Sequence, residues 1–318
     1  MDQELPIRHV KKIMGSNTVI SRFGAVTKKC NYCIIFIPGN PGIIEFYDVF
    51  LLKLHQLTGC RIPVIGIAQA GHSPAWEYAE VDTSGEFFTV AEQILHKIEF
   101  IQTELPPKTK LLLIGHSVGA YIVLKMLENH AISQRLIHAI NLFPAIEDLK
   151  DTPNGRFWMP VSKYCRLPFA LLAFVFSFAP NWFKNALVAW RAKGRPVHEK
   201  ILKPCHSCVS FSLMNHALYM AATEMDDMNE LDESIIAIIH KHESKLTFYY
   251  GSADKWAPLS FYERMRNRFP KVDIRLCDCG FPHDFVLDSS EQVAKLCFDI
   301  FQDRNCLFNV SSSDDEDE

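Results

Sequence analysis

This sequence of 318 residues has few cysteines. It also lacks the pattern of a secretory signal peptide and an apolar run long enough for a transmembrane helix. Ten cysteines are too sparse for a small disulfide-stapled protein, so a reducing compartment is expected. Residues 1–12 carry five charged side chains and no apolar segment. We therefore expect no signal peptide, and a protein that faces the cytosol.

An excess of charge of one sign is also absent from most of the chain. The net charge is −4, but the last five residues are all acidic, and without them 32 acidic side chains face 33 basic ones. With no basic excess, we expect no nucleic-acid partner. Residues 309–318, three serines and five acids among them, are predicted to be a disordered tail.

Two cysteine pairs, Cys30/Cys33 and Cys205/Cys208, have CxxC spacing. A zinc or redox site is the alternative at each, but neither pair brings a second CxxC at zinc-finger spacing. The first pair also enters an apolar segment, where a free cysteine behaves as a small hydrophobic residue. We therefore expect no metal and no cofactor.

What the sequence does contain is a regular alternation of apolar strands and helices. The apolar side chains make up 48% and the charged ones 22%, as in folded globular proteins. Apolar runs predict strands at 33–37, 63–68, 110–114, 139–143 and 246–250, and a further strand is expected at 273–277, where the alternation continues. Helical spacing predicts helices at 43–57, 92–105, 120–127, 262–268 and 291–301. This order predicts an α/β fold with a mostly parallel sheet and flanking helices. Residues 1–146 and 243–308 would form the core, with 147–242 as a helical cap insertion.

A serine stands between the third predicted strand and the following helix, in Gly115-His116-Ser117-Val118-Gly119. This is the GxSxG pattern of the nucleophile elbow of an α/β-hydrolase, in the context that the elbow requires. Gly115 and Gly119 are expected because the sharp turn leaves no room for larger side chains. The alternative is an ordinary Gly-Ser turn. We predict that Ser117 is a catalytic nucleophile.

A serine nucleophile needs a histidine base and a carboxylate that orients the base. In this fold the chain order is Ser, acid, His, and the acid and the base follow strands. Asp254 follows the strand at 246–250 and His283 follows the strand at 273–277. Asp278 and Asp284 compete for the acid role, but Asp254 fits the place of the acid better. The alternative for His283 is a surface histidine.

The tetrahedral intermediate of acyl transfer needs two N–H donors. We expect one from Val118, directly after the nucleophile, and one from Asn40 in the loop Pro38-Gly39-Asn40-Pro41-Gly42. The side chain of Asn40 has an equally good structural explanation, a rigid turn that leads into a helix. His116 and His72 are expected to support loops and to take no part in the proton relay.

The predicted insertion contains an unusual basic and aromatic segment. Residues 152–198 hold no Asp or Glu, seven Lys or Arg and ten aromatic side chains. The uncharged run 167–179 has 13 residues, too short as a helix for a simple membrane span. A soluble lid and a bilayer hairpin are possible, but attachment to a lipid monolayer is favoured, with basic side chains at the anionic surface. The expected contact residues are Phe169, Phe174, Phe176, Phe178, Trp182, Phe183 and Trp190.

Five segments together carry a family resemblance: IPGNPG at 37–42, IGHSVG at 114–119, PNG at 153–155, KLTFYYG at 245–251 and DIRLC at 273–277. In these segments the chain resembles the lipid droplet-associated hydrolases. The resemblance implies a serine lipid hydrolase on the endoplasmic reticulum and on lipid droplets, linked to sterol ester and neutral lipid turnover. It implies the same three catalytic residues, Ser117, Asp254 and His283. The alternative is a droplet-binding or tethering protein with weak or vestigial hydrolase activity.

Overall fold

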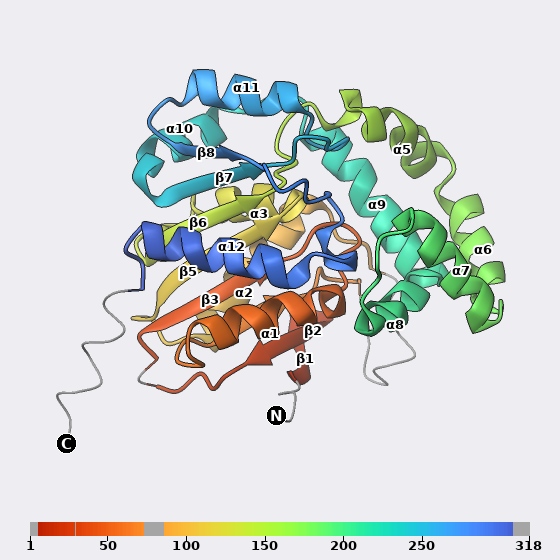
Figure 1. The fold of residues 1–318 in the computed structure, drawn as a ribbon, viewed down its shortest axis with the longest axis horizontal. Helices are drawn as coiled ribbons and strands as arrows, with labels where there is room; N and C mark the ends of the chain where they lie inside the picture. Colours follow the sequence, from red (N-terminus) through yellow and green to blue (C-terminus); the bar gives the residue numbers. More distant parts are fainter. Residues whose placement is uncertain (1–5, 29, 73–85, 308–318) are drawn as a thin grey trace.

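One eight-stranded sheet organises the molecule (Figure 1). The structure is a computed structural model that describes residues 6–28, 30–72 and 86–307, so the predicted tail lies outside the described residues. The strand order is β1-β2-β4-β3-β5-β6-β7-β8. The strands are β1 Ile7–Ile13, β2 Ser16–Phe23, β3 Tyr32–Ile37, β4 Val64–Ile67, β5 Lys110–His116, β6 Leu136–Leu142, β7 Leu246–Tyr250 and β8 Asp273–Leu276. All neighbours from β4 to β8 pair in parallel, which confirms the predicted α/β sheet.

The antiparallel edge formed by β1 and β2 was not predicted from the sequence. β1 pairs with β2, and β2 pairs with β4, both in antiparallel orientation. Lys11 and Lys12 lie inside β1, so the strand has no continuous apolar run. The available signal was the two-residue turn Met14-Gly15, in which both φ angles are positive, as in a tight hairpin.

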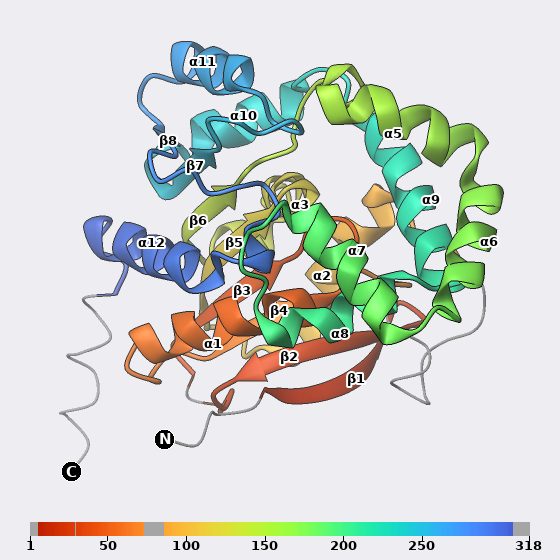
Figure 2. The same ribbon diagram turned by 45° about the vertical axis from the view of Figure 1, so that its right-hand side comes forward.

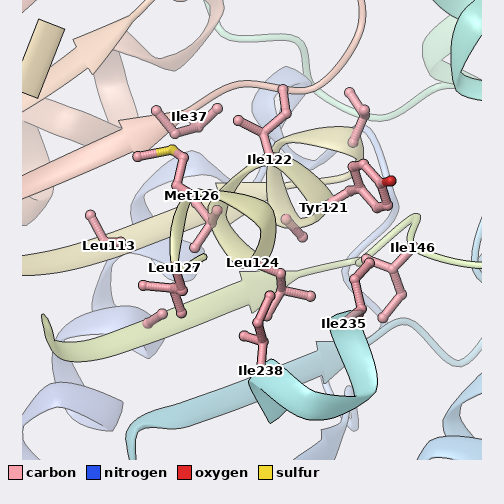
Figure 3. Packing of buried hydrophobic residues seen from close by; sticks show 14 of the residues in the cluster. Ile37, Leu113, Tyr121, Ile122, Leu124, Met126, Leu127, Ile146, Ile235 and Ile238 are labelled. Carbon is pink, nitrogen blue, oxygen red and sulfur yellow. The ribbon is translucent and has the colours of Figure 1, made fainter. Parts of the chain in front are cut away.

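Helices cover both faces of the sheet, because its central strands are apolar on both sides. Within β5, Leu111 and Leu113 pack in one core cluster, and Leu112 and Ile114 pack in the other. The first cluster includes side chains of α2 Val90–Glu104, α3 Val118–Met126, α10 Glu233–Lys241 and α11 Leu259–Arg268. Figure 3 shows the part of it where Leu124 of α3 and Ile235 and Ile238 of α10 pack. The second includes α1 Asp48–Leu57 and α12 Ser290–Asp303. The predicted core helices are therefore present. Short helical turns are η1 Ile44–Tyr47, α4 His130–Ser133, η2 Leu149–Asp151, η3 Glu243–Lys245 and η4 Phe285–Leu287.

Five consecutive helices between β6 and β7 gather beside one end of the sheet, and we call them the cap (Figures 1 and 2). They are α5 Pro153–Tyr164, α6 Arg166–Ser177, α7 Asn181–Ala192, α8 Glu199–Cys208 and α9 Phe211–Asp227. α5 begins where the Thr152 hydroxyl accepts the Gly155 N–H at 2.9 Å, with proline at the first helical position. α10 also falls within 147–242, but it packs against the sheet with α3 and so belongs to the core layer.

Candidate active site

Ser117 lies at the turn where β5 ends and α3 begins. Its φ of 55° and ψ of −124° lie outside the regions that residues with a side chain favour. The Ser117 N–H holds this conformation by donating to the Leu142 carbonyl at 3.0 Å. A Cβ on Gly119 would meet the Ile37 carbonyl oxygen, and one on Gly115 would meet the backbone of Gly119. Close backbone packing thus requires both glycines around a strained serine.

Ser117, His283 and Asp254 form a continuous hydrogen-bonded series. The Ser117 Oγ lies 3.0 Å from the His283 Nε2, and the His283 Nδ1 lies 2.6 Å from the Asp254 Oδ2. The other carboxylate oxygen of Asp254 accepts the N–H groups of Trp256 at 2.7 Å and Ala257 at 3.2 Å. The Asp254 side chain is fully buried, whereas 18% of the His283 side chain is exposed. The Asp254 carboxylate is thus fixed by its own loop, and the His283 ring is partly exposed.

The two competing carboxylates lie away from this series. Asp278 is exposed after the end of β8. Asp284 forms ion pairs with Arg191 at 2.9 Å and Arg195 at 3.0 Å, and Arg195 also pairs with Asp288 at 3.1 Å. Asp284 therefore ties the end of α7 to the loop that carries the histidine. Sequence reasoning did not find this link.

The two other histidines near the site support loops. The His116 Nε2 lies 3.0 Å from the His283 carbonyl, which can only accept, so this nitrogen donates. The His116 Nδ1 then accepts the Tyr47 hydroxyl at 2.8 Å. Burial, followed by the charge of His283, lowers the pKa of His116 well below its usual value, which keeps the ring neutral. His72 accepts the Gly42 N–H at 2.9 Å.

The loop after β3 lies against Ser117. A Cβ on Gly39 would lie 3.0 Å from the Ser117 Cβ. The Gly39 N–H donates to the Tyr47 hydroxyl at 3.3 Å, so it already has an acceptor. The N–H groups of Asn40 and Val118 have no acceptor in the part of the chain that the structure describes. Those two are the expected oxyanion donors.

The cap presents large apolar side chains to solvent along α6 and α7. Phe178 is 76% exposed, Trp182 71% and Trp190 79%, while Ala170 and Ala173 face inward. α6 thus turns its small side chains to the protein and its large ones outward, the reverse of an ordinary surface helix. Among the described residues no single helix could cross a membrane by length and composition. Taken together, α5 and α6 are long and apolar enough, but the two helices meet at a bend of 94°.

Two of the seven predicted lipid-contact residues are only partly exposed. Phe169 is half-buried with its ring 5.7 Å from that of Trp158, and Phe183 is half-buried and stacks on Phe176 at 6.2 Å. They hold cap helices together because a bundle must bury some of its aromatic area. Phe174 and Phe176 are exposed, as expected for the surface, with the three residues above.

The basic side chains of the cap are used within the protein more than was expected. Lys163 pairs with Asp226 at 2.8 Å, and Arg191 and Arg195 pair with Asp284. The Arg166 guanidinium lies 4.7 Å from the centre of the Phe87 ring. These four basic side chains thus have partners within the protein, although Lys163 and Arg191 stay largely exposed. The position of the basic side chains at an anionic surface stays a prediction.

The CxxC pairs are free thiols. Burial raises the pKa of Cys33 and Cys208 well above the usual value, and raises that of Cys205 to about 12, so these thiols stay protonated at neutral pH. Within residues 6–28, 30–72 and 86–307, no cluster of three His, Cys, Asp or Glu side chains is placed to hold a metal ion.

Comparison with known proteins agrees with the family resemblance. A family model described as lipid-droplet associated hydrolase matches residues 30–286. The lipid droplet-associated hydrolase of Homo sapiens is 33% identical over 325 residues, which cover 95% of this chain and 97% of the human protein. The protein of that name from Drosophila melanogaster is 31% identical over 275 residues, 85% of this chain and 88% of its own.

Solved structures establish the fold. An epoxide hydrolase from Vigna radiata superposes with a TM-score of 0.64 at 12% identity, over 95% of this chain and 100% of its own. At that identity the likeness shows the α/β-hydrolase fold and no shared substrate. The sequence relatives, which span nearly the whole chain, carry the family assignment. This chain therefore belongs to the lipid droplet-associated hydrolase family.

Proposed function

We propose that this protein is a serine hydrolase that cleaves lipid esters at the surface of lipid droplets. The observation that carries the proposal is the series Ser117–His283–Asp254, with hydrogen-bond distances of 3.0 and 2.6 Å. The family assignment supports the same class, since the human relative is named a lipid droplet-associated hydrolase.

In the proposed reaction His283 removes the proton of Ser117 as the Oγ bonds to the ester carbonyl carbon. The carbonyl becomes an oxyanion, which the N–H groups of Asn40 and Val118 stabilise, aided by the N-terminus of α3. The protonated His283 then gives its proton to the departing alcohol, and the acyl group stays on Ser117. Water, activated by His283, releases the fatty acid and restores the serine. Asp254 holds the histidine in the required tautomer throughout.

The exposed face of α6 and α7 supports contact with a lipid monolayer. Phe174, Phe176, Phe178, Trp182 and Trp190 offer aromatic side chains to an acyl phase, and the cap that bears them lies beside the catalytic end of the sheet (Figure 2). Such a large exposed apolar surface calls for a partner. We extend the proposal to sterol esters as substrates, and to the cytosolic face of the endoplasmic reticulum as a second location.

Replacing Trp182 with alanine is expected to weaken binding to artificial lipid droplets about 30-fold. Removing a tryptophan that enters the acyl region costs about 2 kcal/mol. Trp182→Phe should retain most of the binding. Leu95→Ala removes an exposed apolar side chain from α2, a helix outside the cap, and should bind as wild type does. Droplet flotation measures the partition of each variant.

The lid alternative makes the opposite prediction for Trp182→Ala. Unchanged flotation, together with a raised KM for a soluble short-chain ester, would assign Trp182 to a lid over the active site. A similar loss of flotation in Leu95→Ala would show that the effect is not specific to the cap.

Labelling with a fluorophosphonate tests the proposed chemistry directly. The probe is expected to modify the wild-type protein once, at the peptide that contains Ser117, as mass spectrometry would show. A panel of sterol, acylglycerol and short-chain esters on droplets then identifies the substrate. Labelling without turnover of any ester would favour the tethering alternative. Absence of labelling at Ser117 would reject the serine mechanism.

A further inference from the structure

The amide side chain of Asn40 joins the loop after β3, residues 38–42, to the cap. The Asn40 Nδ2 donates to the Glu224 Oε1 at 2.8 Å and to the Ala217 carbonyl at 2.9 Å. A primary amide nitrogen has two hydrogens, so both are satisfied by the cap helix α9. Ala217 and Glu224 are seven residues apart, two helical turns on one face. The contact is therefore a two-point clamp.

A glutamate at position 224 is unfavourable for the stability of the fold. It is only 6% exposed, and no Lys or Arg among the described residues forms an ion pair with it. Burial raises the pKa of Glu224 to about 7, although the hydrogen bond from Asn40 opposes the shift. A buried carboxyl group without a cation is unfavourable unless its hydrogen bonds are needed. The side chain that bonds to the Glu224 carboxyl group is that of Asn40, in the loop after β3.

The backbone of the same loop is fixed from the core side. The Gly39 N–H donates to the Tyr47 hydroxyl, and the Pro38 carbonyl accepts the Gln69 Nε2 at 2.9 Å. These bonds hold the residues before Asn40. Gly42, two residues after Asn40, is held in the same way: its N–H donates to the His72 Nδ1 at 2.9 Å, and its carbonyl accepts the Gln69 N–H at 3.0 Å. Among the described residues the side chain of Asn40 bonds to the cap, so α9 supplies the side-chain part of what orients the Asn40 N–H.

We infer that Glu224 is a positioning residue for ester hydrolysis: it holds Asn40 so that the Asn40 N–H points at the oxyanion. The inference rests on the proposed function. α9 also packs against α5 and α6, so the same helix joins the apolar cap surface to the oxyanion donor (Figure 1). The cap is then a part of the catalytic site as well as its cover.

The test compares Glu224→Ala with Glu224→Gln on a soluble short-chain ester, so that droplet binding does not enter. A glutamine oxygen can accept the same hydrogen bond, whereas alanine cannot. Glu224→Ala and Asn40→Ala are each expected to lower kcat on the order of 10- to 100-fold with KM unchanged, because a displaced oxyanion donor acts on the transition state. Glu224→Gln should stay within about threefold of wild type. The double variant should be no slower than the slower single variant.

Asp227→Ala, an exposed position three residues along α9, is the matched control and should retain wild-type kcat. Wild-type kcat in Glu224→Ala, or an equal loss in Glu224→Gln, would overturn the inference. A loss confined to KM, or one accompanied by a lower melting temperature, would reduce the clamp to a structural contact. Wild type that fails to react with the fluorophosphonate at Ser117 would reject the proposed function, and the inference with it.

Discussion

Replacing Ser117 with alanine is expected to lower ester hydrolysis on the order of 10⁴- to 10⁶-fold. The alanine variant keeps the oxyanion donors and the substrate contacts but has no atom to form the acyl intermediate. The residual rate should therefore be that of water attack within the site. Steady-state hydrolysis by the purified variant measures the loss, and fluorophosphonate labelling should disappear with it.

The fold should survive this substitution. The strained turn at residue 117 is held by backbone bonds that alanine retains: the N–H to the Leu142 carbonyl, and the carbonyl that accepts from Ala120 at 3.0 Å and from Ala145 at 3.3 Å. Ser252→Ala changes an exposed serine on the Asp254 loop and should leave activity unaltered. A Ser117→Ala protein that keeps more than a tenth of the wild-type rate would mean that another group is the nucleophile.

Replacing Asp254 with asparagine is expected to lower kcat about 10⁴-fold. The oxygen of the introduced amide can still accept the N–H groups of Trp256 and Ala257, which places the amide NH₂ toward the His283 Nδ1. The histidine nitrogen must then accept, and its proton moves to the Nε2, which faces Ser117. In that tautomer His283 cannot remove the serine proton. The defect lies in proton placement and not in packing.

Asp278→Asn is the matched control, because Asp278 was the competing acid and is exposed. Its kcat should equal that of wild type, and the Asp254→Asn variant should keep its wild-type melting temperature within a few degrees. If Asp278→Asn shows the larger loss, the acid has been assigned to the wrong strand end. The pH profile adds a second readout, since Asp254→Asn should gain rate as hydroxide replaces the general base.

The positions of Ser117, Asp254 and His283 could be predicted because each follows a strand that was expected from the sequence. Parallel strands end at one edge, so local patterns alone place three distant residues together. Tyr47, His116 and Glu224 had no such signal. The bond of Tyr47 to His116 spans 69 positions, and that of Asn40 to Glu224 spans 184. Contacts of this kind depend on how the helices pack, which no local pattern encodes.

The orientation of the cap helices also could not be predicted from the sequence. The lack of acidic residues marked it as a lipid-contact segment, but composition does not say which face of a helix points outward. Ala170 and Ala173 take the inner positions of α6, so the large side chains between them face solvent. Phe169 and Phe183 were expected outside and lie half-buried. α6 has apolar residues on every side, so its sequence contains no polar face that would show which side of the helix points to solvent.

The cap enters and leaves the sheet between two adjacent strands, since β6 pairs directly with β7 from Ala139 and Leu246 onward. A cap of any length can therefore be grafted at this point without changing the register of the sheet. The graft would nevertheless remove connections to the loops of the site, among them Glu224 to Asn40, Asn154 to the Lys255 carbonyl, and Arg195 to Asp284. A chimera with a foreign cap needs these connections rebuilt before the loops are held as they are here.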